Sequence, residues 1–224
     1  MSVAQLVGRL GSYPTMTFPA CRGRIPDLGA LWRYLAEPAE FFGLDMPAPE
    51  QLRDAIGNPA DQLTAVTVTL IEDTRLLVST TDAGFDAEPV RLTELNGESP
   101  AAAVDQWVAM AARTVSLAGT DQQRRLLDEQ GCADGIAGGA PLIGALVVRT
   151  DTGLAAIEPA APAAPIVAQL AACGVSPQLS PATLAERVLR AWWISPQFRI
   201  HPVAQLGSRP LTADPTCPPF LEQM

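Results

Sequence analysis

Two pairs of apolar runs, each joined by a polar turn, place the strongest constraint on the fold of this chain. In residues 63–80, valines alternate with threonines before a polar turn at 72–74, and in residues 142–158 two apolar runs flank a polar turn at 150–153. A two-residue period is typical of a half-buried strand, and each pair of runs joined by a polar turn predicts a β-hairpin. A further strand is expected over 90–95.

Helical patterns surround these hairpins. Asp27 is expected to cap a helix that begins at Leu28 and ends before Pro38, with its apolar residues on one stripe. A second helix is expected over 49–56, with proline in its first turn and Gly57 at its end.

The rest of the chain predicts four more helices and one loop. A Ser-Pro pair opens each of two helices, one over 99–119 and one from 180 to Trp192 and Trp193. Shorter helices are expected over 121–130 and 166–173, and the glycine-rich segment 131–141 predicts a loop.

This order of elements predicts an α+β protein with an N-terminal helical segment. Residues 1–60 form the arm and first helices, 61–140 a first hairpin-plus-helix unit, and 141–224 a second such unit with a proline-rich tail, all of which could form one compact domain. The two units suggest an internal repeat related by a pseudo-two-fold axis. The alternative is that Asp-Thr turns and Ser-Pro caps recur for local reasons.

Charge and composition exclude several classes of function. The net charge of -9 disfavours nucleic-acid binding. All 15 basic residues are arginines, so a P-loop and every lysine Schiff base, including that of pyridoxal phosphate, are excluded. One histidine and the absence of a CxxC pair argue against a zinc site, and no metal or other cofactor is expected.

No apolar run reaches the roughly 18 residues of a membrane-spanning helix, and the first residues do not resemble a secretory signal. A cytoplasmic location is therefore expected. The four cysteines Cys21, Cys132, Cys173 and Cys217 are far apart, and either isolated thiols or two disulfides are compatible with their spacing.

Five residues are candidate binding residues. Adjacent tryptophans cannot both lie on one helical stripe, so Trp192 or Trp193, together with Arg199, is expected to contact a partner, unless the tail covers the exposed ring. Arg22 and Arg24 are candidates for binding a carboxylate or phosphate, the alternative being solvated charges on an irregular arm.

No catalytic residue is predicted. His201 is interpreted as a structural histidine rather than a general base, and the loop 131–139 as a connector rather than an anion cradle. An enzyme would have to rely on carboxylates such as Asp73, Asp134 or Asp151 with arginine anchors.

The tail from Ser195 to Met224 contains many prolines and is expected to lie across the body as an extended strap. We expect Phe198 and Ile200 to pack beside the tryptophans. Truncation after Asp214 is expected to cost little stability.

The lysine-free, Ala/Pro-rich composition resembles that of proteins from high-GC actinobacteria. The layout over about 61–200 is similar to that of the cytosolic substrate-binding chaperones of type VII secretion. This resemblance implies a non-enzymatic protein-interaction module, a secretion accessory or chaperone whose partner is another protein. The alternative is a small-molecule-binding enzyme that uses carboxylates and arginines.

Overall fold

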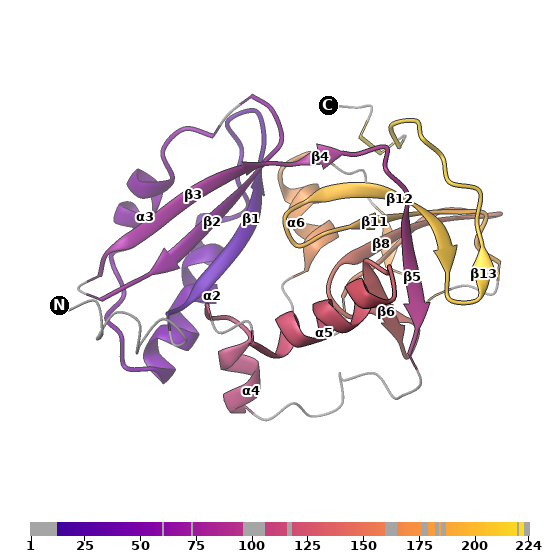
Figure 1. The fold of residues 1–224 in the computed structure, drawn as a ribbon. Coiled ribbons are helices and arrows are strands. Elements are labelled where there is room, and N and C mark those ends of the chain that lie inside the picture. The colour runs from indigo at the N-terminus through magenta and orange to yellow at the C-terminus, as the bar shows by residue number, and fades with distance from the viewer. Residues whose placement is uncertain are drawn as a thin grey trace.

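The computed structural model contains two β-sheets that lie side by side, each with its own helices (Figure 1). It describes residues 13–59, 61–72, 74–95, 106–115, 118–159, 165–175, 179–181, 184, 187–218 and 220–221.

The helices are α2 (Leu28–Phe41), α3 (Pro49–Ile56), α4 (Gln106–Ala111), α5 (Ala118–Glu129) and α6 (Ile166–Ala172). The longer strands are β1 (Thr15–Ala20), β2 (Thr64–Leu70), β3 (Leu76–Asp82), β5 (Val90–Glu94), β6 (Asp134–Ala137), β8 (Ala145–Thr150), β9 (Gly153–Ile157), β11 (Arg190–Ile194) and β12 (Arg199–Leu206). Short two-residue strands are β4 (Gly84–Phe85), β7 (Ala140–Pro141), β10 (Ser180–Pro181) and β13 (Arg209–Pro210).

The first sheet is antiparallel in the order β1-β2-β3, and the β2–β3 pair confirms the first predicted hairpin. Alternation sends Met16, Phe18, Val66 and Val68 to one face, where they pack with Leu35 and other residues of α2 and α3. The threonines between them lie on the opposite face and form hydroxyl pairs across β1 and β2.

Helix α2 begins where the sequence predicts, because the Asp27 carboxylate accepts hydrogen bonds from the backbone N–H groups of Gly29 and Ala30. The prediction that it ends before Pro38 is wrong, since the helix runs through Pro38 to Phe41. Helix α3 spans the predicted residues and ends at a Gly57 with φ of 67°.

The second sheet has ten strands, eight of them in the order β10-β9-β8-β11-β12-β5-β6-β7. The β8–β9 pair confirms the second predicted hairpin. Strand β5 confirms the strand expected over 90–95, although it pairs in parallel with β12 and β6 rather than with the first hairpin. On one side Pro202 pairs with Trp192 of β11. On the other side it lies between the residues of β12 that pair with β4 and those that pair with β5, so its missing N–H interrupts neither of these two parallel pairings.

Three further predicted elements are wrong. The helix expected over 99–119 is not continuous, because α4 ends at Ala111 and α5 begins at Ala118. Residues 180–193 form no helix in the parts described, because Ser180–Pro181 is strand β10 and both tryptophans lie in strand β11. The segment 131–141 is no plain loop, because it contains β6 and β7. Short apolar runs next to glycine or proline are compatible with buried strands as well as with helices or loops, and pairing with distant strands decides the outcome.

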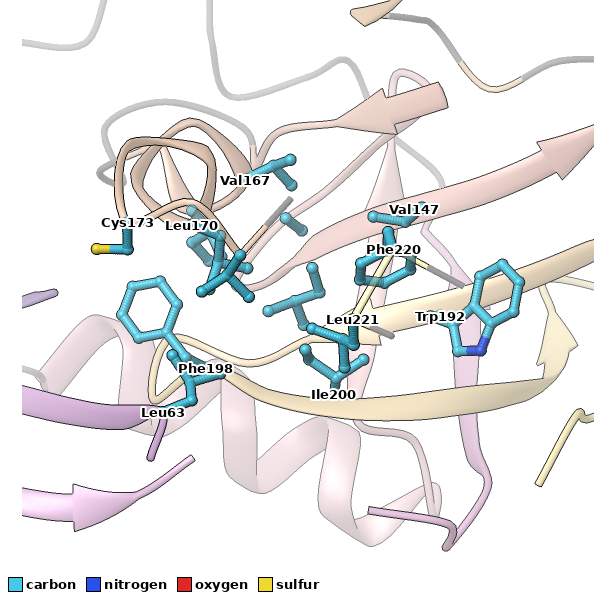
Figure 2. Packing of buried hydrophobic residues seen from close by; sticks show 14 of the residues in the cluster. Leu63, Val147, Val167, Leu170, Cys173, Trp192, Phe198, Ile200, Phe220 and Leu221 are labelled. Atoms are coloured by element: carbon cyan, nitrogen blue, oxygen red, sulfur yellow. The ribbon is translucent and has the colours of Figure 1, made fainter. Parts of the chain in front are cut away.

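Two apolar layers cover the two faces of the second sheet. One contains Leu146, Trp193 and Val203. The other contains Trp192, Phe198 and Ile200 together with α6, and it reaches the first sheet through Leu63 and Ala65 (Figure 2). This second layer therefore joins the two halves of the molecule.

The mixed α+β class is confirmed, whereas the structure lends no support to a pseudo-two-fold repeat. The two hairpins belong to different sheets, and the second lacks the expected Ser-Pro capped helix. The start of the first such helix, at Ser99 and Pro100, lies outside the described residues. Among the described helices, none is both long and apolar enough to cross a membrane.

Candidate functional site

A cavity of about 460 Å³ lies between α2 and α4. Its size falls in the range of about 300–1,000 Å³ that is usual for small-molecule sites. It is lined by Glu37, Glu40 and Phe41 from α2 and by Gln106 and Met110 from α4. Two carboxylates and an amide therefore share the cavity with two apolar side chains.

Helical spacing places both carboxylates beside one another, because residues three apart lie on the same face of a helix. The Glu37 side chain is 63% exposed and pairs with Arg113, whose side chain is only 10% exposed. Within the described residues, no cation pairs with the Glu40 carboxylate. Glu40 is therefore available to a ligand.

Arg113 also explains why α2 continues through Pro38. Proline has no N–H, so it leaves the carbonyl oxygen four residues earlier, that of Tyr34, without its helical donor. The Arg113 guanidinium donates to this oxygen as well as to Glu37. The arginine thereby donates a hydrogen bond to a carbonyl oxygen that Pro38 would otherwise leave without a donor inside the helix.

Pairing beside β1 holds Arg113 in this position. The backbone N–H of Thr15 donates to the carbonyl of Arg113 at 2.9 Å, and the N–H of Val115 donates to Tyr13 at 2.9 Å. The guanidinium carbon lies 3.9 Å from the centre of the Tyr34 ring, a cation–π distance. Burial raises the pKa of the Tyr34 hydroxyl, and the charge of Arg113 opposes that shift.

None of these cavity residues was predicted from the sequence. The three-residue spacing of Glu37 and Glu40 was a visible signal, but it is also that of an ordinary solvated helix face. The contribution of Arg113 depends on a contact across 79 residues of sequence, which no local pattern predicts.

Both tryptophans predicted to meet a partner are buried. Trp192 is 1% and Trp193 is 9% exposed, because neighbouring strand residues point to opposite faces and each face has its own apolar layer. Phe220 packs edge-on against Trp192 with ring centres 5.8 Å apart. The expectation of an exposed indole is thus corrected, and the alternative that the tail covers it is supported.

The other predicted binding residues lie apart from the cavity. Arg199 is 3.9 Å from Asp86, and both side chains are on the surface. Arg22 and Arg24 extend from a tight turn closed by two hydrogen bonds between Cys21 and Arg24. The Arg24 guanidinium lies close to Gly174, since a Cβ atom added to that glycine would be 3.0 Å from it. This places the guanidinium at the carboxyl end of α6, where the helix dipole favours a cation. Anion binding by these two arginines stays a prediction.

His201 and one of the candidate carboxylates, Asp151, have partners on or near the surface. The His201 ring lies 6.0 Å from the Trp193 ring, and its Nδ1 is 3.2 Å from the carbonyl oxygen of Glu88. Asp151 forms an exposed pair with Arg187 at 3.4 Å. Asp73 lies outside the described residues.

Asp134 is fully buried and acts as an acceptor for the segment that follows it. Its carboxylate accepts hydrogen bonds from the backbone N–H groups of Gly135, Leu142, Ile143 and Gly144 and from Nε1 of Trp193 at 2.9 Å. Burial raises the pKa of Asp134, and these donors oppose the shift. A carboxylate enclosed in this way holds the fold together and cannot meet a substrate.

Glycine is required at position 144 by this packing, because a Cβ there would lie 2.4 Å from both the carbonyl oxygen of Ile194 and Nε1 of Trp193. Most of the donors to Asp134 belong to residues 142–144, after the segment 131–139 that was predicted to be a connector.

The four cysteines are thiols rather than disulfides, and Cys217 alone is exposed. Burial, followed by the proximity of Cys21, raises the pKa of Cys173 to about 12. In the described ranges, no three His, Cys, Asp or Glu side chains gather in a way that could hold a metal ion.

Comparison with known proteins identifies the fold. No family model matches the chain, and no curated protein matches it. Solved structures do match. A hypothetical aminotransferase from Mycobacterium tuberculosis in its apo form has a TM-score of 0.64 and 19% identity, covering 97% of this chain and 88% of its own.

The chain has the fold of aminotransferases. A fold IV transaminase from Curtobacterium pusillum gives a TM-score of 0.59 at 16% identity, covering 91% of this chain and 80% of its own. A putative 4-amino-4-deoxychorismate lyase from Legionella pneumophila gives 0.57 at 11% identity, covering 96% and 89%. At such identities the likeness establishes the fold alone.

These matches contradict the prediction of a non-enzymatic interaction module related to type VII secretion. That prediction depended on the scarcity of residues for catalysis and on a supposed repeat of two similar halves. The matched structures are those of aminotransferases and a putative lyase, and the match extends over nearly the whole chain. The secretion-accessory interpretation is therefore wrong.

Pyridoxal phosphate does not fit this chain in the usual covalent way. A second structure of the Mycobacterium tuberculosis protein is its PLP-bound form. Enzymes of this kind hold the cofactor through a Schiff base to a lysine. This sequence has no lysine at any position, so the amine needed for that bond is missing.

Proposed function

We propose that this protein is a small-molecule-binding enzyme that binds an amine-bearing substrate in the cavity between α2 and α4. The observation that carries the proposal is the pair of carboxylates, Glu37 and Glu40, that line this cavity beside Arg113, whose side chain is only 10% exposed. The enzyme-like fold supports an activity, and the absence of lysine directs the chemistry to carboxylates and arginine.

Each lining residue has a role in this proposal. Glu40, with no cation beside it among the described residues, accepts the substrate's ammonium group and is the candidate base for proton transfer. Arg113 holds Glu37 in place and keeps its charge partly compensated. Phe41 and Met110 contact the apolar part of the substrate, and Gln106 supplies an amide.

The charge of the site favours a cation over an anion. Both carboxylates attract an ammonium group. Both would repel an anion, and the arginine that could attract the anion already pairs with Glu37 and with the Tyr34 carbonyl. The net charge of -9 favours the same sign of ligand at longer range.

The test is a panel of small primary amines and amino acids screened by thermal shift, followed by calorimetric titration of those that stabilise the protein. Glu40→Gln keeps the size of the side chain and removes its charge, and we expect it to weaken binding by about tenfold, the scale of one charge-assisted hydrogen bond. Glu88→Gln is the matched control, because Glu88 is exposed and lies in the loop before β5.

Mass spectrometry of each stabilising amine after incubation with the protein tests turnover. Consumption by the wild type and not by Glu40→Gln is the expected result. The proposal fails if no amine stabilises the protein, or if Glu40→Gln binds and converts the amines as the wild type does.

A further inference from the structure

The end of the chain folds back over one face of the second sheet. We call residues 214–218 together with 220–221 the C-terminal strap. Its Asp214 pairs with Arg190 of β11, and its Phe220 lies against Trp192, two residues further along the same strand. Figure 2 shows Phe220 near Val147 and Trp192, with Leu221 beside Ile200. The strap thus places a carboxylate and an aromatic ring next to each other on the sheet.

The surface beneath the carboxylate has more positive charge than the strap neutralises. Arg190 lies directly opposite Arg149 of β8 in the antiparallel register. Side chains in such pairs have Cβ atoms about 4.5–5.5 Å apart, and like charges there repel one another. Asp214 pairs with Arg190, and no described residue pairs with the guanidinium of Arg149.

A second polar group nearby also lacks a partner. Nε1 of Trp192 is buried, and no described residue accepts a hydrogen bond from it. Trp192 is 1% exposed and lies on the same face of β11 as Arg190. It is directly opposite Val147 of β8. A buried donor without an acceptor costs roughly 1–3 kcal/mol, so a native structure seldom leaves one without reason.

We propose that the strap covers a binding site for a small carboxylate that has an aromatic ring, and that Asp214 and Phe220 occupy the positions of its two groups. The ligand carboxylate would lie between Arg149 and Arg190, where arginine forks bind carboxylates in pairs. Its ring would replace Phe220 against Trp192. A ligand whose ring also has a polar acceptor, which the simple probe below lacks, would satisfy the Trp192 donor.

The spacing on the sheet sets the size of the ligand. Arg190 and Trp192 are two residues apart in a strand, which separates them by about 6.4–6.8 Å. A carboxylate joined to a ring by two or three bonds covers this span. We therefore choose 3-phenylpropionate as the probe, with 3-phenylpropan-1-ol to remove the charge and propionate to remove the ring.

Asp214→Asn with Phe220→Ala removes both groups that hold the site. We expect this double variant to bind 3-phenylpropionate at least about tenfold more tightly than the wild type, measured by calorimetry and by quenching of tryptophan emission. Adding Arg149→Gln is expected to reverse the gain. The alcohol and propionate should bind to the double variant at least about tenfold more weakly than the probe.

Two further variants keep the test decisive. Asp214→Asn alone leaves the apolar anchor in place and is expected to tighten binding about threefold, so the proposal can be judged even if the double variant unfolds. Asp151→Asn breaks the exposed pair with Arg187 and should bind as the wild type does. Equal affinity of the wild type and Asp214→Asn, or an unchanged gain when Arg149→Gln is added, would overturn the proposal.

This site involves none of the residues of the α2–α4 cavity. Its test is therefore independent of the proposed enzyme activity, and either result can stand without the other.

Discussion

At the scale of single residues, Asp134 shows how a buried charge can serve the fold instead of the chemistry. Its two oxygens accept from four backbone N–H groups and one indole, which fixes the path from β6 to β8. In Asp134→Asn, one of these oxygens becomes an NH2 group that faces donors. We expect the free energy of unfolding to fall by roughly 1–3 kcal/mol in urea denaturation.

Asp151→Asn is the control for that measurement, because Asp151 forms only an exposed pair and should change stability by less than about 0.5 kcal/mol. If the two variants are equally stable, the network around Asp134 does not support the fold.

The two tryptophans of β11 allow the contribution of one indole hydrogen bond to stability to be measured. Trp193 donates to Asp134, whereas the donor of Trp192 has no partner among the described residues. Replacement by phenylalanine removes a similar volume from each site. Trp193→Phe should therefore cost about 1–3 kcal/mol more than Trp192→Phe in the same denaturation assay, and the reverse order would contradict the assigned hydrogen bond.

Thiol reactivity follows from burial in the same way. The thiolate is the reactive form, and burial raises the pKa of Cys173 to about 12, so almost none of it is ionised near neutral pH. We expect Cys217 to react rapidly with a thiol-specific disulfide reagent in the native protein, and Cys21, Cys132 and Cys173 to react only after denaturation. Rapid labelling of Cys173, located by peptide mass spectrometry, would contradict this burial.

At the scale of elements, α2 depends on a residue far away in the sequence. Pro38 frees the carbonyl of Tyr34, and Arg113 donates to it. A double-mutant cycle of Pro38→Ala and Arg113→Gln tests this link by urea denaturation. We expect Arg113→Gln to cost less in the Pro38→Ala background, with a coupling of about 0.5–1.5 kcal/mol, because alanine supplies its own N–H. Simple additivity of the two changes would refute the link.

The same element shows where local patterns reach their limit. The Asp27 cap, the α3 boundaries and both hairpins were predictable, since each depends on residues within one turn or one strand pair. The continuation of α2 past Pro38 was not, because the donor that permits it comes from residue 113. Strand β11 was missed because its apolar run suits a helix as well, and only pairing with β8 and β12 identifies it.

The strap is a second element whose contribution the structure revises. Phe220 and Leu221 are 1% and 2% exposed, so truncation after Asp214 should no longer be expected to cost little. Loss of a buried phenylalanine lowers the free energy of unfolding by roughly 3–5 kcal/mol. For a chain of this size, each kcal/mol lowers the melting temperature by about 2–4 °C. We expect a melting temperature lower by several degrees and red-shifted tryptophan emission.

Leu126→Ala is the control for the truncation, since Leu126 is 52% exposed and its loss should leave both readings almost unchanged. An unchanged melting temperature of the truncated protein would show that the strap does not support the core.

At the scale of the whole molecule, the composition sets this chain apart from the solved structures that share its fold. The arrangement of two sheets matches aminotransferases over almost the full length, and the complete lack of lysine removes the amine on which their cofactor depends. The lysine-free composition was plain in the sequence, whereas the fold was not, because β5, β6 and β12 pair across long stretches of chain. The cavity was hidden for the same reason, since its walls come from α2 and α4, far apart in sequence.

The most direct test of this account is transamination assayed with and without added pyridoxal phosphate. Purified full-length protein is mixed with a panel of amino-acid donors and 2-oxo acid acceptors, and product amino acids are quantified by mass spectrometry against the cofactor alone. We predict that the protein adds nothing to the rate of the free cofactor, because no lysine can hold it. Saturable, cofactor-dependent transamination by the protein above that background would contradict the account.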